Sequence, residues 1–239
     1  MKAKLLFVIF FLSSMNLIAQ ESKAGKILLK RFREYISGDF DNSSQVFEQM
    51  KAGKIIHPFA VHVNRVADNK VLNRPSNLNG FFLLEESYYL YDGKLMESKP
   101  YLFLFSLHPG NIIHLTTYQL TNYKKEELRN DNTSLRFDYQ SLIPSPSFQG
   151  ADYTWDPKKK TFSTVSVNEL GNGMKFTLSE IFTSTTLQVM ELLEKNGKRL
   201  TSYDTPIVYV RKKRHPKASG MHDMQANINK SNELLLLLN

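Results

Sequence analysis

From Ile55 to Lys212 the apolar residues of this chain recur at about every second position, and short turn-forming pairs interrupt the pattern at regular intervals. Successive side chains of a β-strand point to opposite faces, so a period of two is typical of strands that turn one face to a core. Asp92-Gly93, Pro109-Gly110 and Asn196-Gly197 are among the pairs that favour tight turns between such strands. We therefore predict a mainly β fold, an antiparallel meander barrel; a two-sheet sandwich is the alternative. The predicted strands cover residues 55–67, 79–92, 100–108, 111–121, 134–142, 148–155, 160–168, 174–182, 186–195 and 201–212.

One or two N-terminal helices are predicted to precede the barrel. Apolar residues recur at helical spacing between Ile27 and Ile36, and Gly38 stands where such a helix would end. A second, shorter helix is predicted from Ser43 to Lys51. Asn42 and Gln45 resemble a capping box at its start.

The chain divides into three predicted parts. Residues 1–19 have two early lysines, a short apolar run and the small residue Ala19, the pattern of a secretory signal peptide; an uncleaved N-terminal anchor is the alternative. Residues 20–212 form the barrel domain, and residues 213–239 form a basic tail. The signal predicts an exported protein, periplasmic or secreted. Because the chain has no cysteine, export brings no disulfide framework.

The formal charge of +8 is concentrated at the two ends of the chain. Two positive charges leave with the signal peptide and a net four lie in residues 211–239, which leaves +2 for residues 20–210. A nearly neutral body argues against a nucleic-acid partner. The tail ends in five leucines, Leu234 to Leu238, too few to span a bilayer. It is read either as a frayed or partner-covered tail, or as a contact with a membrane surface or within an oligomer.

Two charged residues stand inside apolar strands and are the first candidates for a site. Arg65 shares the more apolar face of its strand, and Glu85 shares a face with Phe81, Leu83 and Tyr89. If both faces turn to the core, Arg65 is the natural partner of Glu85, since a buried carboxylate needs a cation or hydrogen-bond donors. The pair is either a structural ion pair or part of a cavity that orients a ligand.

Tyrosines cluster near this pair in the predicted meander. Tyr101 shares a face with Phe103, Phe105 and Leu107, and further tyrosines lie on the neighbouring strands at Tyr88, Tyr89, Tyr91 and Tyr118. Such a stripe is either plain core or the wall of a wet pocket, because a buried tyrosine hydroxyl needs a hydrogen-bond partner. No metal site is predicted, since His57 and His62 fall on opposite faces of their strand.

Six short motifs occur in the order found in the CpcT/CpeT family of phycobiliprotein chromophore lyases, which the chain resembles over about residues 30 to 212. The motifs are Gly38-Asp39-Phe40-Asp41-Asn42 with Gln45, the strand Gly80 to Tyr88, Pro100-Tyr101, Gly150-Ala151-Asp152, Ser179-Glu180, and Val208-Tyr209-Val210-Arg211. Glu86, Leu102 and Ala151 stand where the family pattern has Gln, Arg and Cys.

The resemblance implies a calycin/lipocalin-like barrel, often dimeric, that holds an open-chain tetrapyrrole (bilin) without resident covalent attachment. Such a protein assists the transfer of the bilin to a cysteine of an acceptor protein. Arg65 would hold a propionate, and Glu85 would orient or protonate a ring and so be the catalytic residue. The other ligand-binding residues implied are Tyr88, Tyr89, Tyr101, Asp152 and Glu180. Two alternatives stay open. One is an exported, non-catalytic carrier of a haem-derived ligand or another small apolar acid; the other is a solid barrel whose tail docks a partner or a membrane.

Overall fold

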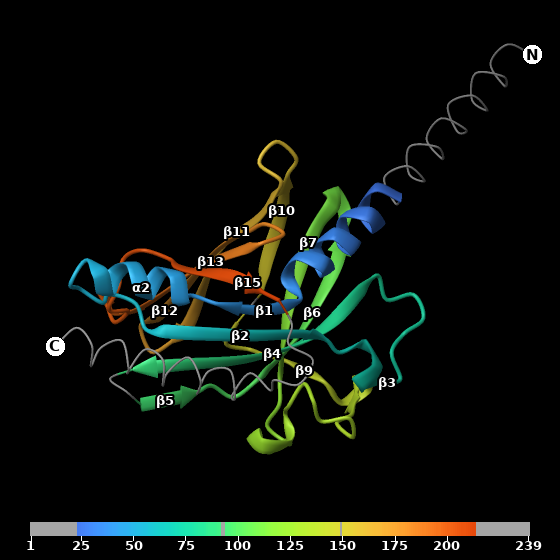
Figure 1. Ribbon diagram of the computed structural model, residues 1–239. Helices are drawn as coiled ribbons and strands as arrows, with labels where there is room; N and C mark the ends of the chain where they lie inside the picture. Colours follow the sequence, from blue (N-terminus) through green and yellow to red (C-terminus); the bar gives the residue numbers. More distant parts are fainter. Residues whose placement is uncertain (1–22, 92–93, 149, 214–239) are drawn as a thin grey trace, which may run out of the picture.

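The computed structural model describes residues 23–91, 94–148 and 150–213 (Figure 1). Ten antiparallel strands form a closed ring in the order β10-β11-β12-β13-β15-β1-β2-β4-β6-β7, and pairing of β7 with β10 closes it. This confirms the predicted mainly β meander barrel and excludes the sandwich. The strands are β1 (Gly38–Asp41), β2 (Phe59–Val66), β4 (Gly80–Tyr91), β6 (Tyr101–His108), β7 (Ile112–Gln119), β10 (Ala151–Asp156), β11 (Thr161–Gly171), β12 (Met174–Phe182), β13 (Thr186–Lys195) and β15 (Ile207–Lys212).

Shorter elements decorate the ring. Three two- to four-residue strands extend it, β5 (Lys94–Glu97) on β4, β9 (Ile143–Pro144) on β7 and β14 (Lys198–Arg199) on β13, while β3 (Val71–Leu72) and β8 (Phe137–Asp138) form a separate parallel pair. The helices are an N-terminal helix that includes residues 23–36, α2 (Ser43–Lys51), and the 3₁₀ turns η1 (Asp68–Lys70), η2 (Pro109–Asn111), η3 (Lys125–Glu127) and η4 (Tyr139–Ser141). Among the described residues no helix is long and apolar enough to cross a membrane.

The N-terminal helix fills one end of the barrel. Phe32 of this helix is 0% exposed. Its ring lies 4.9 to 6.3 Å, centroid to centroid, from five aromatic rings on five strands, namely Phe81, Phe105, Tyr153, Phe162 and Phe182. These strands belong to one arc of the ring, β4-β6-β7-β10-β11-β12, so Phe32 packs against the inner face of that arc. The helix therefore plugs this end with an aromatic core.

Arg211 of β15 fixes the C-terminal end of that helix. Its guanidinium donates hydrogen bonds to the carbonyl oxygens of Glu34, Tyr35 and Ser37, and its Nε donates to the Ser184 carbonyl oxygen at 2.7 Å. The last carbonyl groups of a helix have no partner within the helix and carry partial negative charge. A cation from the last strand thus satisfies the end of the first helix.

A second apolar core lies outside the barrel, under the segment between β7 and β9. Phe82, Leu84, Leu102 and Leu104 point outward from β4 and β6, and they pack against Leu128, Leu135 and Phe137 of this segment. This cover explains why these strands are apolar on both faces. It also corrects one prediction: residues 134–142 do not form a barrel strand. Leu135 and Phe137 bury their side chains in this outer core from a segment that holds the two-residue strand β8, paired with β3, and the 3₁₀ turn η4.

An ion-pair cluster closes the same cover. Glu86 faces outward from β4 and is only 7% exposed. Its carboxylate accepts hydrogen bonds from the Tyr88 hydroxyl at 2.6 Å and from the Asn130 backbone N–H at 2.7 Å, and it lies 3.3 Å from Nη1 of Arg129. Arg129 also pairs with Glu97 of β5. Of the two adjacent glutamates of β4, one is thus held outside the barrel by its own network.

The remaining segments match the sequence predictions in part. Each other predicted strand corresponds to one of the ring, while β1 was not predicted. α2 is confirmed, but Asn42 does not cap it. Its side chain instead donates to the Pro58 carbonyl oxygen and accepts from the Ala60 N–H, joining the start of α2 to β2. The predicted signal peptide (1–19) and the tail beyond Lys213 lie outside the described residues.

Candidate functional site

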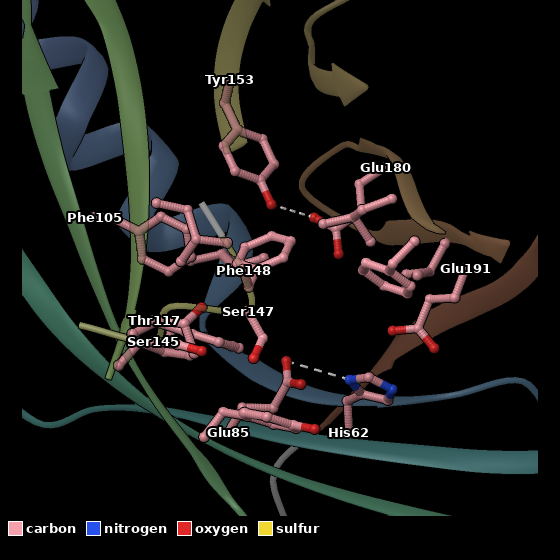
Figure 2. Close-up of a pocket in the computed structure, with 18 of the residues that line it drawn as sticks. His62, Glu85, Phe105, Thr117, Ser145, Ser147, Phe148, Tyr153, Glu180 and Glu191 are labelled. Atoms are coloured by element: carbon pink, nitrogen blue, oxygen red, sulfur yellow. Dashed lines mark hydrogen bonds and ion pairs between the residues drawn. The ribbon is translucent and has the colours of Figure 1, made fainter. Parts of the chain in front are cut away.

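A cavity of about 290 Å³ lies inside the barrel, next to the aromatic plug (Figure 2). Its inner wall is formed by buried residues, among them Ile36 of the N-terminal helix, Leu83, Phe105 and Leu115. The lining residues with the most exposed side chains lie on the opposite side, namely Tyr101 (45%), Leu170 (37%), Ser147 and Glu191. We take this exposed side as the mouth of the cavity. The other lining residues are His62, Phe103, Thr117, Ser145, Phe148, Tyr153, Phe176, Leu178, Glu180, Val189 and Glu85.

His62 and Glu85 form an ion pair in the cavity wall. They lie on neighbouring strands, β2 and β4, and 3.3 Å separates Nδ1 of His62 from Oε2 of Glu85. Their side chains are 7% and 16% exposed, and the Ser87 hydroxyl donates to Oε1 of Glu85 at 3.2 Å. The two adjacent glutamates of β4 therefore face opposite sides of the sheet. Glu85 faces inward to a histidine, and Glu86 faces outward to an arginine.

The two partners stabilise each other's charged form. Burial alone would raise the pKa of Glu85, but the charge of His62 and hydrogen bonds from His62, Ser87 and Asn64 together lower it. Burial would likewise lower the pKa of His62, and the negative charges of Glu85, Glu191 and Glu180 outweigh this and raise it. Each partner thus shifts the pKa of the other toward the charged form.

Glu180 lies across the cavity on β12. The Tyr153 hydroxyl, from β10, donates a hydrogen bond of 2.5 Å to its Oε2 (Figure 2). Burial, together with the negative charges of Glu85 and Glu191, raises the pKa of Glu180 to about 7, although the Tyr153 hydrogen bond and His62 act in the other direction. This carboxyl group therefore changes its charge close to neutral pH, as groups in functional sites often do.

Glu191 of β13 is the third acid in the wall. Its side chain is exposed to the space inside the barrel, where protein surrounds it, and Figure 2 shows its carboxylate turned toward His62 and the cavity. Burial raises its pKa, with His62 opposing and Glu85 adding to the effect. Among the described residues, none donates a hydrogen bond to this carboxylate.

The cavity therefore combines an apolar wall with an excess of acids. Glu85, Glu180 and Glu191 face one imidazole, His62, and none of the described lining residues is a lysine or an arginine. Within the described chain no three histidine, aspartate or glutamate side chains are placed to hold a metal ion. The arrangement can accept hydrogen bonds from a ligand, counter a positive charge, or exchange a proton near neutral pH.

The structure brings together only some of the residues singled out from the sequence. Glu85, Tyr101 and Glu180 line the cavity as expected, although their predicted roles are untested. Tyr89 does not line the cavity, but its hydroxyl lies 3.5 Å from Nε2 of His62, which does. Tyr88 faces the outer cover, where its hydroxyl binds Glu86.

The predicted pairing of Arg65 with Glu85 is wrong. Arg65 lies on the outer face of β2 and forms a 2.5 Å ion pair with Asp39 of β1. The side chains of β2 that turn inward are those of the alternate face, including His62. The apolar face that carries Arg65 packs outside the barrel instead, where Val61 and Val63 contact Tyr88.

Asp152 is also outside the cavity. Its carboxylate is 2.6 Å from Nδ1 of His114 on the outer surface, where β7 and β10 pair. His62, Tyr153 and Glu191 were the site residues that sequence reasoning missed. Glu191 carried a usable signal, since it alternates with Leu187 and Val189 as an acid on an otherwise apolar strand face.

No protein-family model matches the chain, and a search of curated proteins finds no match. The resemblance to the CpcT/CpeT family therefore rests on the short motifs alone. Of these motifs, Glu180 and the strand with Glu85 contribute to the cavity, whereas Asp152 does not.

Proposed function

We propose that this protein binds a small, largely apolar organic molecule inside its barrel. The observation that supports this is a cavity lined mainly by aromatic and aliphatic side chains, into which three glutamates and one histidine also point. Ligand sites in proteins typically have this composition, with volumes of roughly 300–1,000 Å³. A cavity of about 290 Å³ lies at the lower end of that range and suits a ligand of one or two rings.

The buried acids argue against a mere gap in packing. A carboxylate removed from water is costly unless it is paired, and a closed apolar core of this size would be more stable with apolar side chains at these positions. Burial is the chief cause that raises the pKa of Glu180, so the fold keeps an acid where its charged form is disfavoured. A carboxyl group whose pKa is raised by burial is typical of ligand-binding and catalytic sites.

A bilin is the particular ligand suggested by the sequence resemblance. A cavity of about 290 Å³ is too small for all four rings of a bilin, so part of the molecule would have to extend through the mouth. Pyrrole N–H groups inside the cavity would find acceptors in Glu85 and Glu180, whereas the propionates would lie toward the mouth, away from the acids. Lyase chemistry would then use Glu85, held ionised by His62, to orient a ring.

Addition of biliverdin should produce a saturable change in visible absorbance that Glu85→Ala removes. Titration without a spectral change would refute bilin binding. If the predicted signal peptide directs export, the protein would bind the bilin or the smaller apolar ligand outside the cytoplasm.

The general proposal is tested by filling the cavity. Leu115 is 4% exposed and lines the inner wall, so Leu115→Trp should abolish saturable fluorescence of the neutral apolar probe N-phenyl-1-naphthylamine. Leu178→Phe is a milder filling variant if the first does not fold. Val165→Trp is the matched control, because Val165 is 72% exposed on the outside of β11. Binding by the unaltered protein that both filling variants retain, or no saturable binding at all, would refute the proposal.

A further inference from the structure

We infer that the ligand of this cavity carries a positive charge, an amine or a similar organic cation, and that Glu180 and Glu191 are its counter-ions. The inference rests on the proposed function and adds the chemical class of the ligand. It follows from how the acids of the cavity are paired, from their positions on the strands, and from the rings that surround them.

The three glutamates of the wall differ in whether a cation is paired with them. Glu85 has its cation in His62 on the neighbouring strand, at 3.3 Å. Glu180 has a neutral donor, the Tyr153 hydroxyl, and Glu191 receives no hydrogen bond from any described residue. Two carboxyl groups thus face the cavity without a cation of their own.

Glu180 and Glu191 are placed to act on one ligand group. In the pairing of β12 with β13, Glu180 lies opposite Val189 and Leu178 lies opposite Glu191, so the two acids are diagonal neighbours on the inner face. Diagonal positions on one sheet face are about 7–8 Å apart, within joint reach of long side chains. Figure 2 shows both carboxylates directed into the same space. A single ammonium group between them would contact both.

The surrounding charges are those expected of a site that binds a cation. Glu180 faces Tyr153 from β10, Glu85 from β4, His62 from β2 and Glu191 from β13. Burial and the neighbouring acids keep the pKa of Glu180 at about 7. A bound cation would favour the ionised form and lower this pKa, so that binding near pH 7 would release a proton.

The rest of the lining suits the organic part of such a ligand. Tyr101 and Phe103 are stacked at 5.7 Å between ring centroids, and Phe148 and Phe176 pack at 6.1 Å. Aromatic faces attract cations as well as apolar groups. A carboxylic acid would bring a further negative charge to a wall that already holds three acids and no lysine or arginine among its described residues. The geometry therefore favours an amine over the apolar acid expected from the sequence.

Three indole compounds of nearly equal size test the sign of the charge: tryptamine, tryptophol and indole-3-acetate, which are cationic, neutral and anionic at pH 7. Each is titrated into the purified full chain and monitored by displacement of N-phenyl-1-naphthylamine and by calorimetry. Tryptamine should bind at least 10-fold more tightly than tryptophol, and indole-3-acetate should bind most weakly. Calorimetry in two buffers of different ionisation enthalpy should show proton release with tryptamine and none with tryptophol.

Two variants assign the effect to the named acids. Glu191→Gln and Glu180→Gln should each weaken tryptamine at least 10-fold and leave tryptophol unchanged, while Glu169→Gln, an exposed acid on the neighbouring strand β11, should change neither. Equal affinity for the three compounds, tightest binding of indole-3-acetate, or probe binding that tryptamine does not displace would overturn the inference and leave the proposed function standing. Failure of the probe itself to bind would instead refute the proposed function.

Discussion

Replacing Glu180 by glutamine should stabilise the folded protein at pH 8 and leave its stability at pH 4.5 almost unchanged. The carboxyl group of Glu180 has a pKa of about 7 in the folded protein, against the ordinary value of 4.5 that applies to the unfolded chain. Between these two values the folded state holds a proton that the unfolded state has lost. Because stability rises with pH only where the unfolded state binds more protons, this group makes stability fall as the pH rises from 4.5 to 7.

The size of the effect follows from the two pKa values. Each tenfold difference in proton affinity corresponds to about 1.4 kcal/mol, so the ionised Glu180 lowers the free energy of unfolding by about 3 kcal/mol above pH 7. Glutamine has nearly the same shape, and its amide oxygen can still accept the Tyr153 hydroxyl hydrogen bond. Glu180→Gln should therefore remove this pH-dependent loss of stability and keep the packing of the side chain.

Urea unfolding followed by circular dichroism at several pH values between 4.5 and 8.5 measures the difference between the two proteins. Taking this difference removes the contributions of titratable groups that do not interact with Glu180, and leaves those of Glu180 and of the groups coupled to it, His62 among them. The matched control is Glu169→Gln, which lies outside the barrel and should give a flat difference. A difference between Glu180→Gln and the unaltered protein that is independent of pH, or that grows toward acid pH, would refute the reasoning.

Three further substitutions test the supports of the barrel. Arg129→Ala should cost about 3 kcal/mol in urea unfolding, because it leaves Glu86 and Glu97 close together under the outer cover without their cation; a cost below about 1 kcal/mol would mean that the cluster is solvated like a surface pair. Arg211→Ala should cost about 2 kcal/mol and speed amide hydrogen exchange in the last turn of the N-terminal helix; unchanged exchange there would contradict its capping role. Phe32→Ala should cost about 3–5 kcal/mol by thermal or urea unfolding, since it removes the central ring of the plug, and a loss under 1 kcal/mol would show that the helix is not part of the core.

The barrel itself was predictable because each strand carries its own period-two pattern and its own turn. The second core was not, because nothing local to Phe82 or Leu104 says what will cover them. The same loop that covers them made residues 134–142 look like a strand. Apolar side chains at Leu135 and Phe137 alternate as they would in a barrel strand, but they pack in the outer core from a segment with the two-residue strand β8.

The site was only partly predictable for a related reason. The alternation in β2 gives two faces but does not say which one turns inward, and the more apolar face is the outer one here because Val61 and Val63 are covered by Tyr88. Choosing that face placed Arg65 in the cavity and overlooked His62. In β4 both faces are apolar and each carries an acid, so the pattern singled out Glu85 without showing which face turns inward, and Glu180 was named only through the family resemblance.

The pairing of β1 with β15 sets when the ring can close during synthesis. Asp39 lies opposite Lys212, so the first strand of the ring is completed only by the last. A growing chain that has not yet produced residues 207–212 would present β1 and β13 as open edges, with unpaired backbone groups that favour association with other chains. The barrel is thus expected to finish folding only after residues 207–212 have left the ribosome, and truncation before residue 207 should produce aggregation rather than a smaller domain.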